Sequence, residues 1–287
     1  MAEMVSTLQE ISAARRKALV VPREHGAWGM LLVPLASGAA VGFLRGNNVA
    51  SFVLLLVTAL GLFWLRTPAE SLMGTSPTRA QTIPERWLAA KFVLLLATVS
   101  AVALTALLWG GRNLVVLVIG GVALAAFGLQ VLARSISRHY RMAAQMIGAA
   151  GLSATAPAAY YVVTGHFDQT AAGLWLANWI FAGDQIHYVQ MTLHHSKVRG
   201  FVERLSRGLG FFFGQAMMFG AVFGACTAGV LPKFVILAFL PVVLRGAWFF
   251  FKKPAPLALV RLGVSELMHS ISFGLLLFVS FAWKGWA

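Results

Sequence analysis

Four charged side chains lie within otherwise apolar segments of this chain: Lys91, Asp184, Arg245 and Glu266. A charge at membrane depth costs about 2.5–3.5 kcal/mol on insertion scales, so such groups usually face the interior of a helix bundle and find partners there. Two acids and two bases of this kind predict buried ion pairs, a proton relay or a pocket for a charged ligand. These residues are therefore the first candidates for chemistry.

Both buried acids are followed by a histidine at helical spacing. His187 comes three residues after Asp184, and His269 comes three residues after Glu266, so each pair shares one helix face. Carboxylates and imidazoles are the usual general acids and bases of enzymes and proton carriers. The candidates for catalysis or proton transfer are therefore His25, Asp184, His187, Glu266 and His269.

A second set of polar residues is placed to hold an anionic ligand at a similar depth. Arginine binds carboxylates and phosphates through paired hydrogen bonds, and several arginines flank or enter the apolar segments. We expect the ligand-binding residues to come from this set: Arg23, Glu24, Arg66, Glu70, Lys91, Gln190, His194 and Arg245.

The sequence leaves several interpretations of these residues open. In the first, Asp184 and Glu266 simply pair with Lys91 and Arg245, and the histidines bind buried carbonyl groups. In the second, the arginines line a pocket for an anionic substrate, with a histidine or carboxylate as proton carrier. In the third, the histidines and acids hold haem or a transition metal. A proton or ion pathway is the fourth.

The composition places these residues in a membrane protein. Of the 287 residues, 59% are hydrophobic and only 11% are charged, and the mean hydropathy is +0.78. A soluble domain of this composition could not cover its surface with polar groups. Because the chain is a membrane protein, its formal net charge of +14 does not indicate a nucleic-acid partner. We expect no nucleic acid to bind, and we expect the lipid bilayer to surround the chain. The oligomeric state is left open.

The apolar segments are continuous rather than alternating, which favours helices over a β-barrel. About 20 helical residues cross a hydrocarbon core of roughly 30 Å, and nine segments approach or exceed that length. We therefore predict an all-α, polytopic membrane bundle of about nine transmembrane helices. The predicted spans are residues 27–44, 49–65, 87–109, 113–133, 142–163, 170–195, 209–231, 234–251 and 263–283.

The distribution of positive charge orients this bundle. Most of the 23 lysines and arginines fall in one set of loops, whereas the opposite set contains only Arg45, Arg112, Lys233 and Lys284. By the positive-inside rule the N-terminus is cytoplasmic and the C-terminus external. Residues 1–25 form an amphipathic segment on the cytoplasmic surface, and residues 26–287 form a single nine-helix domain. The longest predicted cytoplasmic loops follow the second and sixth helices.

Two segments carry a resemblance to a known family. The run from Val21 to Met30 (VPREHGAWGM) resembles the signature of the YwiC-like family of bacterial membrane proteins. The segment from Gln145 to Gly165 is similar to the same family. The resemblance implies the bacterial inner membrane, but it brings no reaction with it.

The architecture also resembles the UbiA-type intramembrane prenyltransferases. That resemblance implies an isoprenoid diphosphate held by Mg²⁺ on aspartate-rich motifs after the second and sixth helices. The corresponding stretches here, Arg66–Glu70 and Asp184–His195, lack the paired aspartates, which disfavours Mg²⁺-dependent prenyl transfer. The expected function is the binding or processing of an isoprenoid or lipid-like anionic substrate in a cytoplasm-facing polar cavity among the first, second, sixth, eighth and ninth helices. An enzyme of this kind would be a UbiA-like transferase without the usual Mg²⁺-diphosphate motifs. The alternatives are a small-solute or ion transporter and a haem- or metal-holding subunit.

Overall fold

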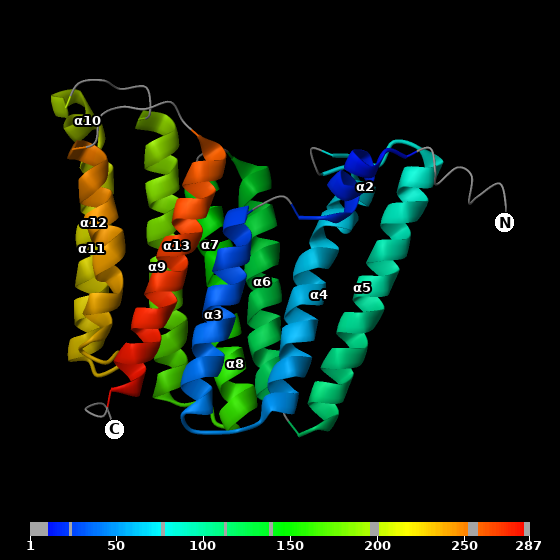
Figure 1. Ribbon diagram of the computed structural model, residues 1–287, viewed down its shortest axis with the longest axis horizontal. Helices are drawn as coiled ribbons and strands as arrows, with labels where there is room; N and C mark the ends of the chain where they lie inside the picture. Colours follow the sequence, from blue (N-terminus) through cyan, green and yellow to red (C-terminus); the bar gives the residue numbers. More distant parts are fainter. Residues whose placement is uncertain are drawn as a thin grey trace. The chain divides into compact units, whose positions relative to one another are not determined.

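The computed structural model describes residues 11–22, 25–75, 78–111, 114–137, 140–195, 201–251 and 258–283. All the elements in these ranges are helices, so the predicted all-α class is confirmed (Figure 1). Six of the described helical segments are long and apolar enough to cross a bilayer. The chain is therefore a multi-pass membrane protein.

The helices of the chain group into two compact units. The first comprises Met1–Glu24 and Val49–Asn113, and the second comprises His25–Asn48 and Leu114–Ala287. Each unit is described by itself below. The expectation of a single domain over residues 26–287 remains a prediction.

The first unit is a helical hairpin with a short helix at one end. The hairpin consists of α4 (Val49–Met73) and α5 (Ile83–Trp109), and the short helix is α2 (Ala13–Val20) (Figure 1). Trp64 on α4 donates its indole N–H to the carbonyl of Val20 over 2.8 Å. The hydroxyl of Ser71 on α4 donates to the carbonyl of Thr78 over 2.9 Å and lies 3.3 Å from the carbonyl of Leu19. The bond from Trp64 satisfies a carbonyl group at the end of α2 that lacks an intrahelical donor.

An ion pair joins the other face of α2 to the start of α5. Arg15 Nε donates to Glu85 Oε1 over 2.6 Å, and this hydrogen bond raises the pKa of Arg15 above its ordinary value. Glu85 also completes a capping box with Thr82 at the start of α5. The cap starts α5 at Ile83, four residues before the predicted span, while α4 continues past residue 65 to Met73. The loop predicted over residues 66–86 is therefore mostly helical.

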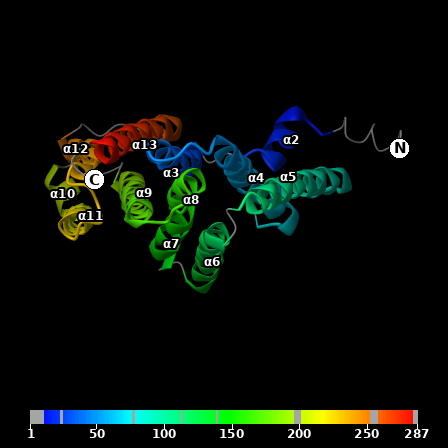
Figure 2. The same ribbon diagram turned by 90° about the horizontal axis from the view of Figure 1, so that it is seen from below.

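The second unit is arranged around one long helix. Its elements are α3 (His25–Phe43), α6 (Leu114–Ile136), α7 (Arg141–Ser153), α8 (Thr155–Thr164), α9 (Gln169–His195), α10 (Phe201–Arg207), α11 (Leu209–Thr227), α12 (Val235–Phe251) and α13 (Leu259–Ala282). Helix α9 packs against α3, α7, α8, α11 and α12 (Figure 2). At about 1.5 Å per residue its 27 residues extend roughly 40 Å. It therefore presents side chains to most of the unit along its length.

A proline divides the span predicted over residues 142–163. Helix α7 ends at Ser153 and α8 begins at Thr155, so the helix breaks three residues before Pro157. Pro157 has no N–H to donate to the carbonyl of Ser153, and its ring clashes with that carbonyl in a continuous helix. The hydroxyl of Thr155 instead donates to the carbonyl of Leu152 over 2.7 Å.

Helices α3 and α8 approach each other closely because α3 presents a glycine where they meet. A Cβ atom added at Gly38 would overlap the backbone carbonyl of Ala156. Gly42, one turn further along α3, faces Tyr160 and Val163 in the same way. Small residues at four-residue spacing are a common means of bringing membrane helices together.

We predict that Gly38→Ala destabilises the protein by about 1–3 kcal/mol, because overpacking forces the two backbones apart. Thermal unfolding of the purified protein in detergent measures the effect. Gly120→Ala on α6 is the matched control, since a Cβ atom there meets nothing within 4 Å. A Gly38→Ala variant that unfolds at or above the wild-type temperature would contradict the close approach.

Candidate functional site

One guanidinium group lies between two carboxylates in the second unit. Arg245 on α12 donates from Nη2 to Asp184 Oδ2 on α9 over 2.8 Å, and from Nη1 to Glu266 Oε2 on α13. The exposed fractions of the three side chains are 5% for Arg245, 1% for Asp184 and 7% for Glu266. The structure thus brings together three of the four charges that the sequence singles out.

The three residues lie inside their helices rather than at the ends. At about 1.5 Å per residue, Asp184 is roughly 16 Å from the C-terminal end of α9, and Arg245 is roughly 9 Å from that of α12. Glu266 is about 10 Å from the N-terminal end of α13. The sequence predicts that these residues converge in depth, and their direct contacts agree with that expectation.

The triad, as we call Asp184, Arg245 and Glu266, carries more negative than positive charge. Both described ion pairs of the two acids are made to the same arginine. With all three groups ionised, one negative charge remains uncompensated. An uncompensated charge within an apolar bundle is strongly unfavourable.

Neutral side chains complete the hydrogen bonding of the triad. Gln215 on α11 donates from Nε2 to Asp184 Oδ1. Gln185 on α9 donates from Nε2 to the Glu266 carbonyl over 3.0 Å and to Ser270 Oγ over 2.7 Å. Both oxygens of Asp184 therefore accept hydrogen bonds, and Gln185 bonds to the Glu266 backbone and to Ser270.

Two atoms of the triad lack a partner within the part of the chain that the structure describes. They are Glu266 Oε1 and Arg245 Nε, both of which are buried. Above the guanidinium lies the ring of Tyr188, whose centroid is 3.9 Å from Arg245 Cζ, a cation–π distance. Glu266 is therefore the acid with an open position, and Asp184 is the acid with a complete set of hydrogen bonds.

The two predicted histidines lie beside the acids on the same helices. His187 packs so closely against α11 that a Cβ atom at Gly214 would overlap its ring. Its ring centroid is 5.4 Å from that of Phe211. His269 Nδ1 is 2.7 Å from the carbonyl of Ser265. A carbonyl only accepts, so Nδ1 carries the hydrogen, and Nε2 of the neutral ring is left as an acceptor.

Other predicted site residues belong to the first unit and contact each other or aromatic rings. Arg66 donates from Nε to Glu70 Oε1 over 2.7 Å within α4. Lys91 is exposed, and its Nζ lies 5.4 Å from the centre of the Trp87 ring. The interpretation in which Lys91 and Arg245 each neutralise an acid is thus corrected: Arg245 pairs with both acids.

The remaining candidates are only partly covered by the structure. Gln190 on α9 donates to Gln145 Oε1 over 3.4 Å. Arg23 and Glu24 lie outside the described residues, and so do the side chains of His25 and His194. Their predicted roles remain predictions.

Three residues of the site were missed by the sequence analysis. Gln215 is a lone amide in the apolar segment FFFGQAMMFG, and its isolation could have been noticed in the same way as that of the charges. Tyr188 follows Asp184 by four residues and shares its helix face. Gln185 had no such signal, because its partners on α13 cannot be inferred from α9 alone.

A metal-binding group is not formed by the described side chains. Within these residues no three histidine, cysteine, aspartate or glutamate side chains are grouped as metal ligands. The metal or haem hypothesis also involves His25 and His194, whose side chains are not described. It therefore remains a hypothesis without a structural observation in its favour.

Comparison with known proteins bears out the first resemblance. The family model described as YwiC-like protein matches residues 21–160, just under half of the chain. This range includes all of α3 to α7 and most of α8. No curated protein matches the chain, and no solved structure does.

We predict that Arg245→Met destabilises the protein by about 3–5 kcal/mol, because the two buried acids then lose the cation that they share. Adding Asp184→Asn and Glu266→Gln removes these charges and should restore most of the stability. Thermal unfolding in detergent measures both variants.

Lys91→Met is the control for the loss of a cation from a transmembrane helix. The Lys91 side chain is exposed, so this substitution should change the free energy of unfolding by no more than about 0.5 kcal/mol. Wild-type stability in the Arg245→Met variant would show that the triad contributes nothing to the fold.

Proposed function

We propose that this protein is a proton-coupled membrane transporter of a small solute, with Glu266 as its proton-binding residue. The observation that carries the proposal is the sharing of Arg245 by two buried acids, with Glu266 Oε1 unpartnered among the described residues. A charge at membrane depth costs about 2.5–3.5 kcal/mol, and a proton on one acid removes it. The site is therefore neutral with one proton bound.

Glu266 is the acid that fits this role better. Asp184 accepts one hydrogen bond at each oxygen, from Gln215 and from Arg245, and such bonds stabilise the carboxylate anion. The Glu266 carboxylate accepts from Arg245 at Oε2, while Oε1 has no hydrogen-bond partner among the described residues. The proton is then held at Glu266 Oε1.

The other titratable groups around the triad suit proton transfer. His187 lies one turn from Asp184, and His269 lies one turn from Glu266 with Nε2 left as an acceptor. Tyr188 covers Arg245 on the side of α9. Intramembrane chains of acids and histidines are typical of proton pathways in pumps and transporters. We assign the histidines to the transfer of protons to and from the acids.

The helices support the nine-span topology that the sequence predicts. The six long apolar segments, the shorter apolar helices of α3 and α12, and the more polar α9 together make nine. An odd number puts the termini on opposite sides. We propose that the N-terminus is cytoplasmic, as the positive-inside rule requires, and that the membrane is the bacterial inner membrane.

The expected UbiA-like site for an isoprenoid or other anionic lipid is less well supported. An anionic head group would need free cations, but both terminal nitrogens of Arg245 already bind carboxylates. Arg66 likewise pairs with Glu70. A ligand phosphate would have to displace an acid from Arg245 before it could bind there. A UbiA-like fold therefore remains a prediction, and we propose no transferase reaction.

Uptake by liposomes tests the transporter proposal. The purified protein is reconstituted, an inward proton gradient is imposed, and the vesicles are given a defined mixture of small polar metabolites. We expect at least one solute to accumulate only with the gradient, as measured by mass spectrometry. Glu266→Gln should abolish this accumulation, because the variant cannot exchange a proton.

Lys91→Gln is the matched control, since it removes a membrane-embedded cation outside the triad and should retain uptake. Accumulation by Glu266→Gln at the wild-type level would contradict the proposal. So would a wild-type protein that accumulates no solute from the mixture.

A further inference from the structure

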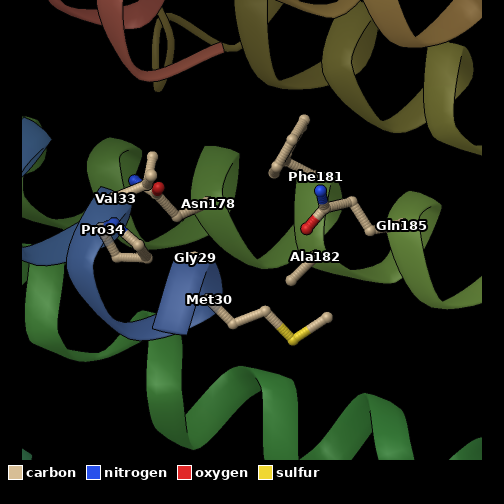
Figure 3. Close-up of a pocket in the computed structure, with 8 residues that line it drawn as sticks. All are labelled: Gly29, Met30, Val33, Pro34, Asn178, Phe181, Ala182 and Gln185. Carbon is tan, nitrogen blue, oxygen red and sulfur yellow. The ribbon is translucent and has the colours of Figure 1, made fainter. Parts of the chain in front are cut away.

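A small cavity lies between α3 and α9 in the second unit. Its empty space, open solvent included, is about 200 Å³, of which the centre of a water-sized sphere can reach about 10 Å³. Its lining includes Met30 and Pro34 of α3 and Asn178, Phe181 and Gln185 of α9 (Figure 3). A cavity needs roughly 10–15 Å³ of such reachable space to hold one water. The cavity therefore fits water-sized ligands and not a lipid chain.

Asn178 presents an unpartnered oxygen at this cavity. Its side chain is almost completely buried, with 1% exposed. Nδ2 donates to the Leu174 carbonyl over 2.8 Å and to Ser37 Oγ over 3.3 Å, so the amide nitrogen is fully used. Oδ1 has no hydrogen-bond partner among the residues that the structure describes. A buried amide oxygen of this kind requires a donor from elsewhere.

Pro34 leaves a second acceptor on a residue that lines the same cavity. Pro34 lies inside α3 and has no N–H, so the carbonyl of Met30 loses its usual helical donor. A donor outside the helix, such as a bound water, would complete its hydrogen bonding.

The amide at the other end of the cavity offers no hydrogen to an occupant. Figure 3 shows Asn178 and Gln185 on α9 with Phe181 and Ala182 between them. Both hydrogens of Gln185 Nε2 are directed at Glu266 and Ser270. The polar atoms available to an occupant are therefore acceptors, which excludes an anion. A divalent cation needs about six oxygen ligands, more than the two identified here, whereas water suits this set.

We propose that this cavity is a binding site for water, held by Asn178 Oδ1 and the carbonyl of Met30, and that this water lies on the route by which protons reach Glu266. The water site is argued from the cavity alone, and the proton route rests on the proposed transport function. The cavity ends at Gln185, which contacts the Glu266 backbone and Ser270. Water there lies one side chain away from the proton-binding residue.

Nuclear magnetic resonance tests the water site directly. The full chain is prepared in lipid nanodiscs with ¹⁵N in its asparagine side chains, and Asn178→Leu identifies the Asn178 signal. We expect cross-relaxation between the Asn178 amide protons and water. Pro34→Ala should weaken this signal, because residue 34 then donates an N–H to the Met30 carbonyl.

Pro241→Ala is the matched control, since Pro241 lies inside α12 and does not line the cavity. The signal should be unchanged in this variant. Absence of the signal from the wild-type chain, or its persistence at full strength in Pro34→Ala, would overturn the water site. An equal loss of the water signal in Pro241→Ala would overturn the water site too, because the loss would then not depend on a residue that lines the cavity.

A cavity-filling variant tests the route. Ala182→Val narrows the cavity and should abolish the water signal while slowing proton-driven uptake several-fold. If Ala182→Val loses the water signal but takes up solute at the wild-type rate, the proposed proton route is overturned. If the wild-type protein takes up no solute, the proposed function fails, but the resonance experiment still decides the water site.

Discussion

The structure of the second unit depends on one guanidinium group that binds two carboxylates in an apolar bundle. Arg245 connects α12 to Asp184 on α9 and to Glu266 on α13, so it fixes the relative positions of three helices. The same interaction leaves one negative charge without a partner. The contacts of Arg245 hold the three helices together, and the charge imbalance is the basis of the proposed proton-binding role of Glu266.

Helix α9 gives the triad its surroundings because it carries polar side chains on more than one face. Asp184 and Tyr188 meet Arg245, while Gln185 and Asn178 face α13 and α3 respectively. Such a helix remains stable in a membrane because its neighbours bury and pair its polar groups. Helix α9 thus carries polar groups at both the cavity and the triad, with Phe181 and Ala182 between Asn178 and Gln185.

The sequence predicted the depths of the buried charges better than it predicted their ion-pair partners. The depth of Asp184, Arg245 and Glu266 follows from helix geometry alone, and their convergence could be anticipated. The pairing of both acids with Arg245 could not be anticipated, because it depends on how each helix is rotated about its axis. The break before Pro157 has a local cause in the proline itself, whereas the cavity beside Pro34 depends on packing between helices, which no local pattern encodes.

The most direct test of the account is the protonation state of Glu266, measured by infrared spectroscopy with ¹³C-labelled glutamate carboxyl groups. At neutral pH we predict the carbonyl stretch of a protonated acid in the wild-type protein, shifted by the label. It should be lost in Glu266→Gln. It should also be lost in Asp184→Asn, because Arg245 then neutralises Glu266 alone. Absence of a protonated glutamate in the wild-type protein would contradict the account.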